Sequence, residues 1–377
     1  MKKYDKVVLI TGGCGFIGSH VVRHFVKTYP NYLIINLDAM TYAGNKENLK
    51  DIEDSENYIF EYADIRYYVD ACRIFDQYQV TDVIHMAAES HVDRSLVNPF
   101  EFVETNVNGT VNLLNAANIT WDDPTKEHVF FSMITDEIFG SLGEDDPPFN
   151  ENTPLDPHSP YSTSKTAQYL FGKTYFESYG LPVISLACGN AIGPNQFPEK
   201  LVPLTIDRLM NGEKIPIYGA GEQMRDWTNV HDIVSAIDLL FHKGTPGELY
   251  CIGGDACKKN IDVVYTLIGL YATAVVNNGE NELVNVEQFE NKIKELKSLI
   301  TFIPDPRGKS HDFRYDLDHT KITKELGWEP KYTFEESVWE TLKWYMENQD
   351  WVENVKNGDY KNWIDKYYGK FGNQKTM

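Results

Sequence analysis

Three glycines at three-residue intervals, set between an apolar run and a helical pattern, constrain the fold of this chain most. Residues 6–10 are apolar and mostly β-branched, which predicts a buried strand. Gly12, Gly15 and Gly18 follow, and the apolar residues after them repeat with a helical period. In this context the first glycine permits a tight turn, the second lets backbone approach a pyrophosphate, and the third lets the helix pack closely. The stretch predicts the strand, loop and helix that open a dinucleotide-binding domain.

An aspartate closes the second predicted strand. Residues 33–37 form that strand, and Asp38 lies about 20 residues beyond the glycines, where an acidic ribose ligand is expected. A carboxylate there accepts hydrogen bonds from the ribose 2′-hydroxyl and repels a 2′-phosphate, which favours NAD over NADP. The alternative interpretation is a turn residue after a strand. The glycine loop favours the cofactor interpretation.

Strands and helices alternate through the first half of the chain. We expect further strands at 58–62, 83–86, 129–133 and 183–187, and helices at 102–117 and 161–179. This order predicts an α/β fold, a doubly wound parallel-sheet Rossmann domain with a smaller mixed α/β C-terminal substrate lobe. We place the NAD-binding domain at 1–188 and the nucleotide-sugar-binding lobe at 189–377, with an approximate boundary and some segments crossing back.

Two groups of polar residues carry the chemistry. Tyr161 and Lys165 are four residues apart in a predicted helix, so their side chains point the same way. A lysine cation stabilises a phenolate, so we expect Lys165 to lower the pKa of Tyr161 and make it a base for a substrate hydroxyl. Asp136 and Glu137 add two carboxyl groups, and different environments would make one an acid and the other a base.

Composition excludes several classes of function. The formal net charge of −21 argues against a nucleic-acid surface. Five scattered cysteines without a C-x-x-C pair argue against a disulfide framework or a zinc site, so we expect no metal and a reducing compartment. We find no signal-peptide pattern and no apolar run of membrane-spanning length. These features predict a cytoplasmic protein that does not bind membranes.

The acidic, proline-rich stretch at 141–160 has neither a helical nor a strand period, which predicts a loop. Two interpretations remain open for it: a cover over the site, or a crossover on the surface.

Several motifs together resemble one family. They are residues 11–18 (TGGCGFIG), 38–45 (DAMTYAGN), 87–93 (AAESHVD), 135–137 (TDE), 159–162 (SPYS) with Lys165, 197–201 (FPEKL) and 225–227 (RDW). This set resembles the dTDP-glucose 4,6-dehydratases of the extended short-chain dehydrogenase/reductase group. The glycine and Tyr/Lys motifs mark only the superfamily, whereas TDE with AESHVD is much more specific. The resemblance runs from Val7 to about Trp363.

The resemblance implies a mechanism. Tyr161, assisted by Lys165 and Thr135, takes the proton of the sugar 4-hydroxyl while hydride passes from C4 to NAD. The 4-keto group acidifies the C5 proton, which Glu137 removes, and Asp136 protonates the departing 6-hydroxyl. The hydride then returns to C6, giving a 4-keto-6-deoxy sugar. A homodimer formed through a four-helix contact is also implied, with the helices near 102–117 and 161–179 as candidates.

The resemblance further implies the binding residues. The NAD contacts are Gly12, Gly15, Phe16, Ile17, Gly18, Asp38, Ala39, Met40, Thr41, Asp64, Ile65, Met86, Ala87, Ala88, Ser90, Thr105, Tyr161, Lys165 and Ala191. The substrate contacts are Ser90, Thr135, Asn190, Lys200, Leu201, Pro216, Ile217, Tyr218, Arg225, Asn260, Arg307 and His311. Arg225 and Arg307 suit a diphosphate, because a guanidinium fork matches phosphate oxygens. For either arginine the alternative is a surface ion pair.

The chain departs from the family pattern at four places. Ile134 stands where serine is usual, Phe139 where tyrosine is usual, and Ala191-Ile192 where Asn-Tyr is usual; the order of residues around Arg307 is also rearranged. Each of the first three replaces a hydrogen-bonding side chain, and each lost contact would cost about 0.5–1.5 kcal/mol. The Thr/Asp/Glu/Tyr/Lys set is intact.

Three alternatives to a dTDP-glucose dehydratase remain. The same chemistry could act on UDP-glucose or another nucleoside-diphosphate glucose. A nucleotide-sugar 4-epimerase needs Tyr161 and Lys165 but neither Asp136 nor Glu137. A non-catalytic NAD- or nucleotide-sugar-binding protein would explain the altered Ile134 and Ala191.

Overall fold

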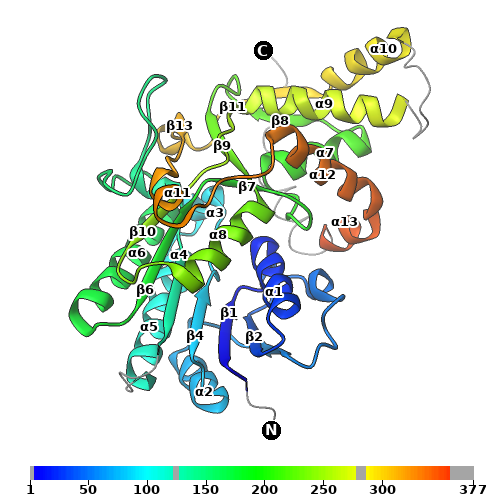
Figure 1. Ribbon diagram of the computed structural model, residues 1–377. Helices are drawn as coiled ribbons and strands as arrows, with labels where there is room; N and C mark the ends of the chain where they lie inside the picture. Colours follow the sequence, from blue (N-terminus) through cyan, green and yellow to red (C-terminus); the bar gives the residue numbers. More distant parts are fainter. Residues whose placement is uncertain (1–3, 122–126, 277–285, 357–377) are drawn as a thin grey trace.

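A seven-stranded parallel sheet forms the centre of the larger half of the molecule (Figure 1). The computed structural model describes residues 4–121, 127–276 and 286–356; Trp363, where the family resemblance ends, lies outside them. The strand order is β10-β6-β5-β4-β1-β2-β3. The strands are β1 (Lys6–Thr11), β2 (Tyr32–Asp38), β3 (Tyr58–Tyr62), β4 (Asp82–His85), β5 (Val129–Met133), β6 (Val183–Cys188) and β10 (Leu249–Ile252). The predicted doubly wound Rossmann fold is confirmed.

Helices cover both faces of this sheet. They are α1 (Phe16–Thr28), α2 (Tyr68–Tyr78), α3 (Val92–Val97), α4 (Pro99–Phe102), α5 (Gly109–Thr120), α6 (Pro160–Tyr179), α8 (Val230–Lys243) and α11 (Thr320–Leu326), with short turns η1 (Lys46–Leu49), η3 (Asp136–Phe139) and η4 (Gly308–Ser310). The helix expected at 102–117 is irregular, because a π-helical stretch, η2 (Val103–Asn108), precedes α5. Helix α2 was not predicted from the sequence.

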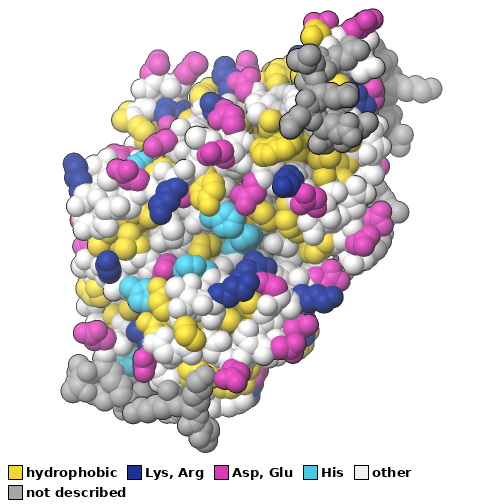
Figure 2. All heavy atoms as spheres, turned by 45° about the vertical axis from the view of Figure 1, so that its right-hand side comes forward, with side chains coloured by type: hydrophobic (Ala, Val, Ile, Leu, Met, Phe, Trp, Pro, Cys, Tyr) yellow, Lys and Arg dark blue, Asp and Glu magenta, His cyan; other side chains and the backbone are white. Residues whose placement is uncertain are grey.

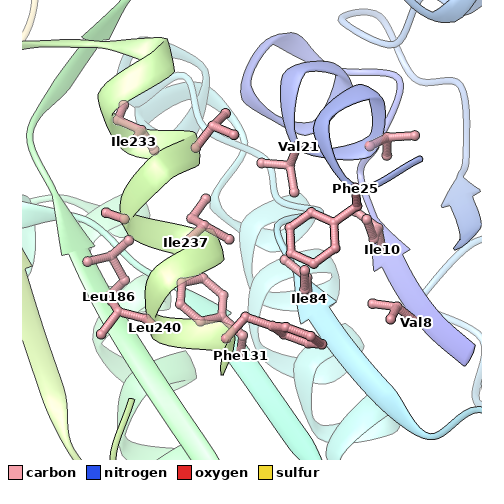
Figure 3. Packing of buried hydrophobic residues seen from close by; sticks show 14 of the residues in the cluster. Val8, Ile10, Val21, Phe25, Ile84, Phe131, Leu186, Ile233, Ile237 and Leu240 are labelled. Carbon is pink, nitrogen blue, oxygen red and sulfur yellow. The ribbon is translucent and has the colours of Figure 1, made fainter. Parts of the chain in front are cut away.

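Alternate residues of each strand face opposite helix layers. Val8 and Ile10 pack under α1 and α8, and Figure 3 shows Phe25 of α1 and Ile237 of α8 over this face. Leu9 points to the other face, where α2 and α5 pack. Because both faces are covered, the strands read as continuous apolar runs, and this made them recognisable in the sequence.

The order of the strands creates a crevice. The chain leaves β1 toward β2 and β3 on one side and returns to β4, β5 and β6 on the other. Open sheets of this kind bind ligands outside the carboxyl ends of the strands where the order reverses. Asp38 is the last residue of β2, and Met86 and Ile134 directly follow β4 and β5.

The smaller half is built from short strands and helices. Strands β11 (Cys257–Lys259), β9 (Met224–Asn229), β13 (Arg314–Tyr315) and β7 (Asn190–Ile192) form one sheet, and β8 (Ile215–Tyr218) pairs with β12 (Ile300–Ile303). The helices are α7 (Leu201–Asn211), α9 (Asn260–Val276), α10 (Val286–Lys297), α12 (Phe334–Glu347) and α13 (Gln349–Val355). These elements share a second apolar core.

The two halves are interleaved in sequence. Strand β10 pairs with β6 in the large sheet, and α8 packs over that sheet, although both follow residue 188. The division into 1–188 and 189–377 stays a proposal about which part contacts which ligand.

The loop at 141–160 lies against the body of the protein. Leu142 and Phe149 bridge to Arg314 and Leu317 beside β13, and the Arg314 guanidinium donates to the carbonyls of Gly143 and Asp146. Among the described residues that line the main cavity, none lies within this loop. The surface-crossover interpretation therefore fits the structure.

Three further findings concern the surface, the helices and the possible metal ligands. Acidic side chains are spread over the face shown in Figure 2, with basic ones between them. In the described ranges no helix is both long and apolar enough to cross a membrane. The same part of the chain brings together no group of three acidic, histidine or cysteine side chains able to hold a metal ion.

Candidate active site

A cavity of about 460 Å³ lies at the carboxyl edge of the large sheet and extends into the smaller half. Every residue predicted to act in catalysis or to contact NAD or substrate lines it, with the single exception of Met40. The structure thus brings these residues together around one space; their individual roles stay predictions. A volume of this size is typical of sites for small ligands.

Met40 turns away from the cavity. Its side chain packs against the apolar core under α1, and its backbone has a φ of 51°. Its N–H donates to Asp38 Oδ1 at 2.8 Å. If this residue serves the cofactor, it does so by fixing Asp38 through its backbone.

The glycine loop makes a cradle of bare backbone. Gly12 has a φ of +74°, and a Cβ there would lie 2.7 Å from Ala87 Cα. A Cβ on Gly18 would lie 2.0 Å from the Gly12 carbonyl oxygen, so the helix can approach the loop only without a side chain. Gly15 differs, because its Cβ would meet only Gly12 O, at 3.3 Å, and the residue faces the cavity. These three environments fit the three roles predicted for the glycines.

Asp38 is fixed by two backbone donors. Cys14 N–H donates to Oδ2 at 2.9 Å, and Met40 N–H donates to Oδ1. Burial raises the pKa of Asp38, and the two backbone hydrogen bonds work against that rise. Each oxygen keeps a further lone pair, which leaves the carboxylate able to accept from a ribose hydroxyl.

Tyr161 lies in the first turn of α6. Pro160 occupies the first helical position, and Ser159 caps the helix by accepting from Ser162 N–H. Burial and the neighbouring Glu137 raise the pKa of the Tyr161 phenol, while a hydrogen bond with Thr135 lowers it. The sequence-based prediction of a lowered pKa is therefore not met by the protein groups alone, because burial and the nearby carboxylates outweigh the hydrogen bond with Thr135.

Lys165 is held by acceptors at the end of β5. Its ammonium donates to Met133 O at 2.8 Å and to Gln168 Oε1 at 2.6 Å. Burial lowers the pKa of Lys165 to about 7. Lys165 lines the cavity together with Tyr161. Its hydrogen bonds, however, are made to Met133 at the end of β5 and to Gln168 in α6.

Asp136 and Glu137 occupy different environments, although they are adjacent. Asp136 is buried, and burial together with the charge of Glu137 raises its pKa to about 7. Its Oδ1 accepts from the Thr135 hydroxyl at 3.0 Å, whereas Oδ2 has no partner among the described residues. A carboxyl group of this kind keeps a substantial protonated fraction near neutral pH and suits a general acid.

Glu137 faces the cations of the smaller half. Burial raises its pKa, and Arg307, Lys200 and Arg225 work in the opposite direction. Three cations therefore favour the ionised form of Glu137, whereas at Asp136 the charge of Glu137 outweighs the opposing effect of Arg225. The pair fits one base and one acid.

Arg307 pairs with a buried carboxylate at the cavity. Its Nε donates to Asp93 Oδ1 at 2.5 Å, and the Tyr218 hydroxyl donates to Asp93 Oδ2 at 2.9 Å. Burial would raise the pKa of Asp93, but Arg307 and these partners hold it at about 2. The ion pair that we left open as an alternative does exist, yet it lines the cavity rather than the outer surface.

Arg225 is used differently. Its guanidinium donates to the carbonyls of Met224, Phe313 and Asp312, and it lies 4.2 Å from the Tyr315 ring centre. These bonds fix the turn that carries Asp312 beside the cavity. Arg225 therefore brings positive charge to the cavity from a rigid position.

Sequence reasoning assigned no role to several lining residues. Asp93 and Glu89 lie within the AAESHVD motif, and Glu199 lies within FPEKL, so the motifs themselves were the available signal. Burial raises the pKa of Glu89 to about 7. Tyr315 also lines the cavity and belongs to none of the motifs.

The departures from the family pattern fall in different places. Ile134 and Ala191 line the cavity, so an apolar side chain replaces a polar one there. Phe139 is buried against Phe149, with ring centres 5.3 Å apart, and Ile192 is fully buried in the smaller core. The last two changes lie outside the cavity lining.

A Rossmann sheet, a glycine cradle and a Tyr/Lys pair beside two carboxyl groups define an enzyme of the extended short-chain dehydrogenase/reductase class. The chain belongs to the GDP-mannose 4,6 dehydratase family, whose profile matches residues 9–341.

Curated relatives and solved structures agree with this assignment. A dTDP-glucose 4,6-dehydratase of Shigella flexneri is 44% identical over 96% of this chain and 98% of its own length. The crystal structure of dTDP-glucose 4,6-dehydratase from Bacillus anthracis in complex with NAD is 39% identical, with a TM-score of 0.78 over 93% of this chain and 100% of that one. The corresponding enzyme DesIV of Streptomyces venezuelae, with NAD and TYD bound, is 35% identical, with a TM-score of 0.80 and the same coverage.

Proposed function

We propose that this protein is an NAD-dependent dTDP-glucose 4,6-dehydratase, which converts dTDP-glucose to dTDP-4-keto-6-deoxyglucose. The observation that carries the proposal is that Asp136 and Glu137 line the same cavity as Tyr161 and Lys165. A sugar oxidoreductase needs only the second pair, whereas elimination of water also needs an acid and a base. Relatives of this name match nearly the whole chain.

The residues present fit NAD. A Cβ on Gly12 or Gly18 would collide with backbone, and Gly15 leaves room for a ligand at the N-terminus of α1. Asp38 can accept from a ribose hydroxyl, and it lines the same cavity as Tyr161 and Lys165. NAD, when bound, supplies a reversible oxidation, in which a hydride leaves C4 and later returns to C6.

Tyr161, Glu137 and Asp136 each transfer a proton at a different atom of the sugar. Tyr161 accepts the proton of the 4-hydroxyl, and positive charge from Lys165 and a bound nicotinamide offsets the burial that raises its pKa. Glu137 removes the C5 proton, which the neighbouring ketone has made acidic, and returns a proton to C5 once C6 has received the hydride. Asp136, protonated near neutral pH, gives its proton to the departing 6-hydroxyl. Arg307 and Tyr218 bind the nucleoside diphosphate.

Mass analysis of the product tests this function. Purified protein incubated with dTDP-glucose should give a sugar nucleotide lighter by one water. The same incubation with UDP-glucose measures the preference for the nucleotide base. We expect UDP-glucose to react more slowly than dTDP-glucose. A product of unchanged mass with an inverted C4 would establish an epimerase. No product from either nucleotide, with measurable binding of both, would establish a non-catalytic protein.

We also propose a cytoplasmic homodimer. The scattered, unpaired cysteines suit a reducing compartment. Apolar side chains are exposed on the segment around α4 and on α6: Val97 (70%), Phe100 (76%), Val103 (48%) and Leu170 (45%). Exposed apolar groups on neighbouring helices suit a helix-to-helix contact between two subunits. Sedimentation of the protein and of a Phe100→Glu variant tests this: the variant should sediment as a monomer.

A further inference from the structure

The segment that follows β2 has little structure of its own, yet it forms a wall of the cavity. Ala39, Thr41, Ala43 and Gly44 line the cavity next to the glycine loop, and only η1 at 46–49 is regular. A segment without ladder hydrogen bonds keeps its position only through contacts made from elsewhere. Backbone and surface contacts, such as Asn45 N–H to Cys14 O, hold part of it, and two sets of buried side-chain contacts tie it to distant parts of the chain.

Tyr42 makes the first set. Its hydroxyl donates to Glu199 Oε1 at 3.1 Å, across 157 residues of sequence. Its ring lies beneath the Arg94 guanidinium, 3.5 Å from the ring centre, and edge-on to Phe197, with ring centres 5.6 Å apart. Glu199 is buried and lines the cavity, so this contact joins two cavity walls.

Asn48 makes the second set. Its Oδ1 accepts from the indole N–H of Trp351 in α13 at 2.8 Å and from the Asn195 amide at 3.2 Å. Its Nδ2 donates to the carbonyl of Cys14, inside the glycine loop, at 3.0 Å. One buried amide thus connects α13, the segment before α7 and the phosphate cradle. Val355 of α13 also packs with Phe197.

We propose that Tyr42, Glu199, Asn48 and Trp351 are positioning residues that hold the 39–49 segment over the cofactor and slow its release between turnovers. The proposal rests on NAD as the cofactor, not on the identity of the sugar. It has a chemical reason: the hydride removed from C4 must return to the same sugar. A cofactor that left with the hydride would leave an unfinished ketone, so slow release protects each turnover.

The test measures release of NAD from the loaded protein without substrate. NAD-loaded protein is diluted into a large excess of a second dehydrogenase that captures free NAD, and captured NAD is followed with time. Tyr42→Phe removes a single oxygen and should release NAD about tenfold faster, as expected for loss of a hydrogen bond to a buried carboxylate. Trp351→Phe, which removes one of the two donors to Asn48, should give a smaller increase of about threefold.

Matched controls separate this effect from general loosening. Tyr265→Phe and Trp339→Phe make the same chemical changes at side chains that are 42% and 40% exposed on α9 and α12. Release at the wild-type rate from these controls, with faster release from Tyr42→Phe, supports the proposal. Wild-type release from Tyr42→Phe and Trp351→Phe, or equal acceleration in the controls, overturns it. Because no sugar is present, the outcome is independent of whether dTDP-glucose is dehydrated.

Discussion

The cofactor side and the substrate side of the cavity are built in different ways. On the cofactor side the shape comes from backbone: a strand, a glycine loop and a helix that are contiguous in sequence. On the substrate side it comes from side chains that meet across long separations. Asp93 reaches Tyr218 over 125 residues and Arg307 over 214. The glycine cradle of the cofactor side should therefore lose affinity for NAD when a side chain is added, whereas the substrate side should lose affinity for the sugar nucleotide when a side chain is changed.

The largest expected effect on turnover comes from a change at Glu137, where the cofactor side and the substrate side meet. Glu137→Gln keeps the size of the side chain but removes the base, so turnover of dTDP-glucose should fall by about 100- to 10,000-fold. Oxidation at C4 does not need this carboxylate, so reduced cofactor should still form in the first turnover and be visible by its absorbance. Wild-type turnover in this variant would remove Glu137 from the mechanism.

A methyl group added to the glycine loop should weaken the binding of NAD. Gly18→Ala places a Cβ 2.0 Å from the Gly12 carbonyl oxygen, where only backbone movement can relieve the clash. We expect NAD affinity to fall by about 10- to 100-fold, measured by titration of the cofactor-free protein. Gly269→Ala in α9 is the control, since no atom lies within 4 Å of its new Cβ. Equal affinities in the two variants would contradict the predicted role of the loop.

Replacing one carboxylate oxygen of Asp93 should weaken substrate binding and leave NAD binding unchanged. Asp93→Asn keeps the shape but removes the charge that orients Arg307, so KM for dTDP-glucose should rise by about tenfold. NAD release should not change, because the hydrogen-bond partners of Asp93 among the described residues, Tyr218 and Arg307, belong to the substrate side. Steady-state kinetics and the release assay separate the two. A rise in NAD release with constant KM would reverse the assignment.

The dependence of kcat/KM on pH should show the titration of the general acid, Asp136. Burial and Glu137 raise the pKa of Asp136 to about 7, so its protonated form is lost as pH rises through that value. Lys165, whose pKa burial lowers to about 7, loses its charge in the same range. We expect kcat/KM to fall above pH 7, steeply in the wild type. Asp136→Asn should show only the shallower limb that belongs to Lys165, and an unchanged limb would exclude Asp136 as the acid.

The sequence predicted the cofactor side well because its physics is local. Apolar β-branched runs mark buried strands, and Gly12 is required by a positive φ that the turn imposes. The fold class follows from the alternation of these strands with helices. The irregular start of α5 was not predicted, because a π-helical stretch leaves no sequence period of its own.

On the substrate side, the sequence did not predict the contacts that hold the cavity residues in place. The family motifs pointed to residues that do line the cavity, but not to what holds them. Arg225 lines the cavity but donates to three backbone carbonyls, and Phe139, which replaces the usual tyrosine, packs against Phe149 outside the cavity lining. The pKa of Tyr161 rises where a fall was predicted, because burial depends on the whole fold. Side-chain partners more than 100 residues apart leave no local pattern to read.

A labelled substrate tests the central claim, that one cavity joins a transient oxidation to an elimination on the same sugar. dTDP-glucose carrying deuterium at C4 is incubated with the protein, and the product is analysed by mass and by NMR. The account predicts a product lighter by one water with the deuterium at C6. Deuterium found again at C4 of a sugar that keeps its 6-hydroxyl, or lost to solvent, would contradict it.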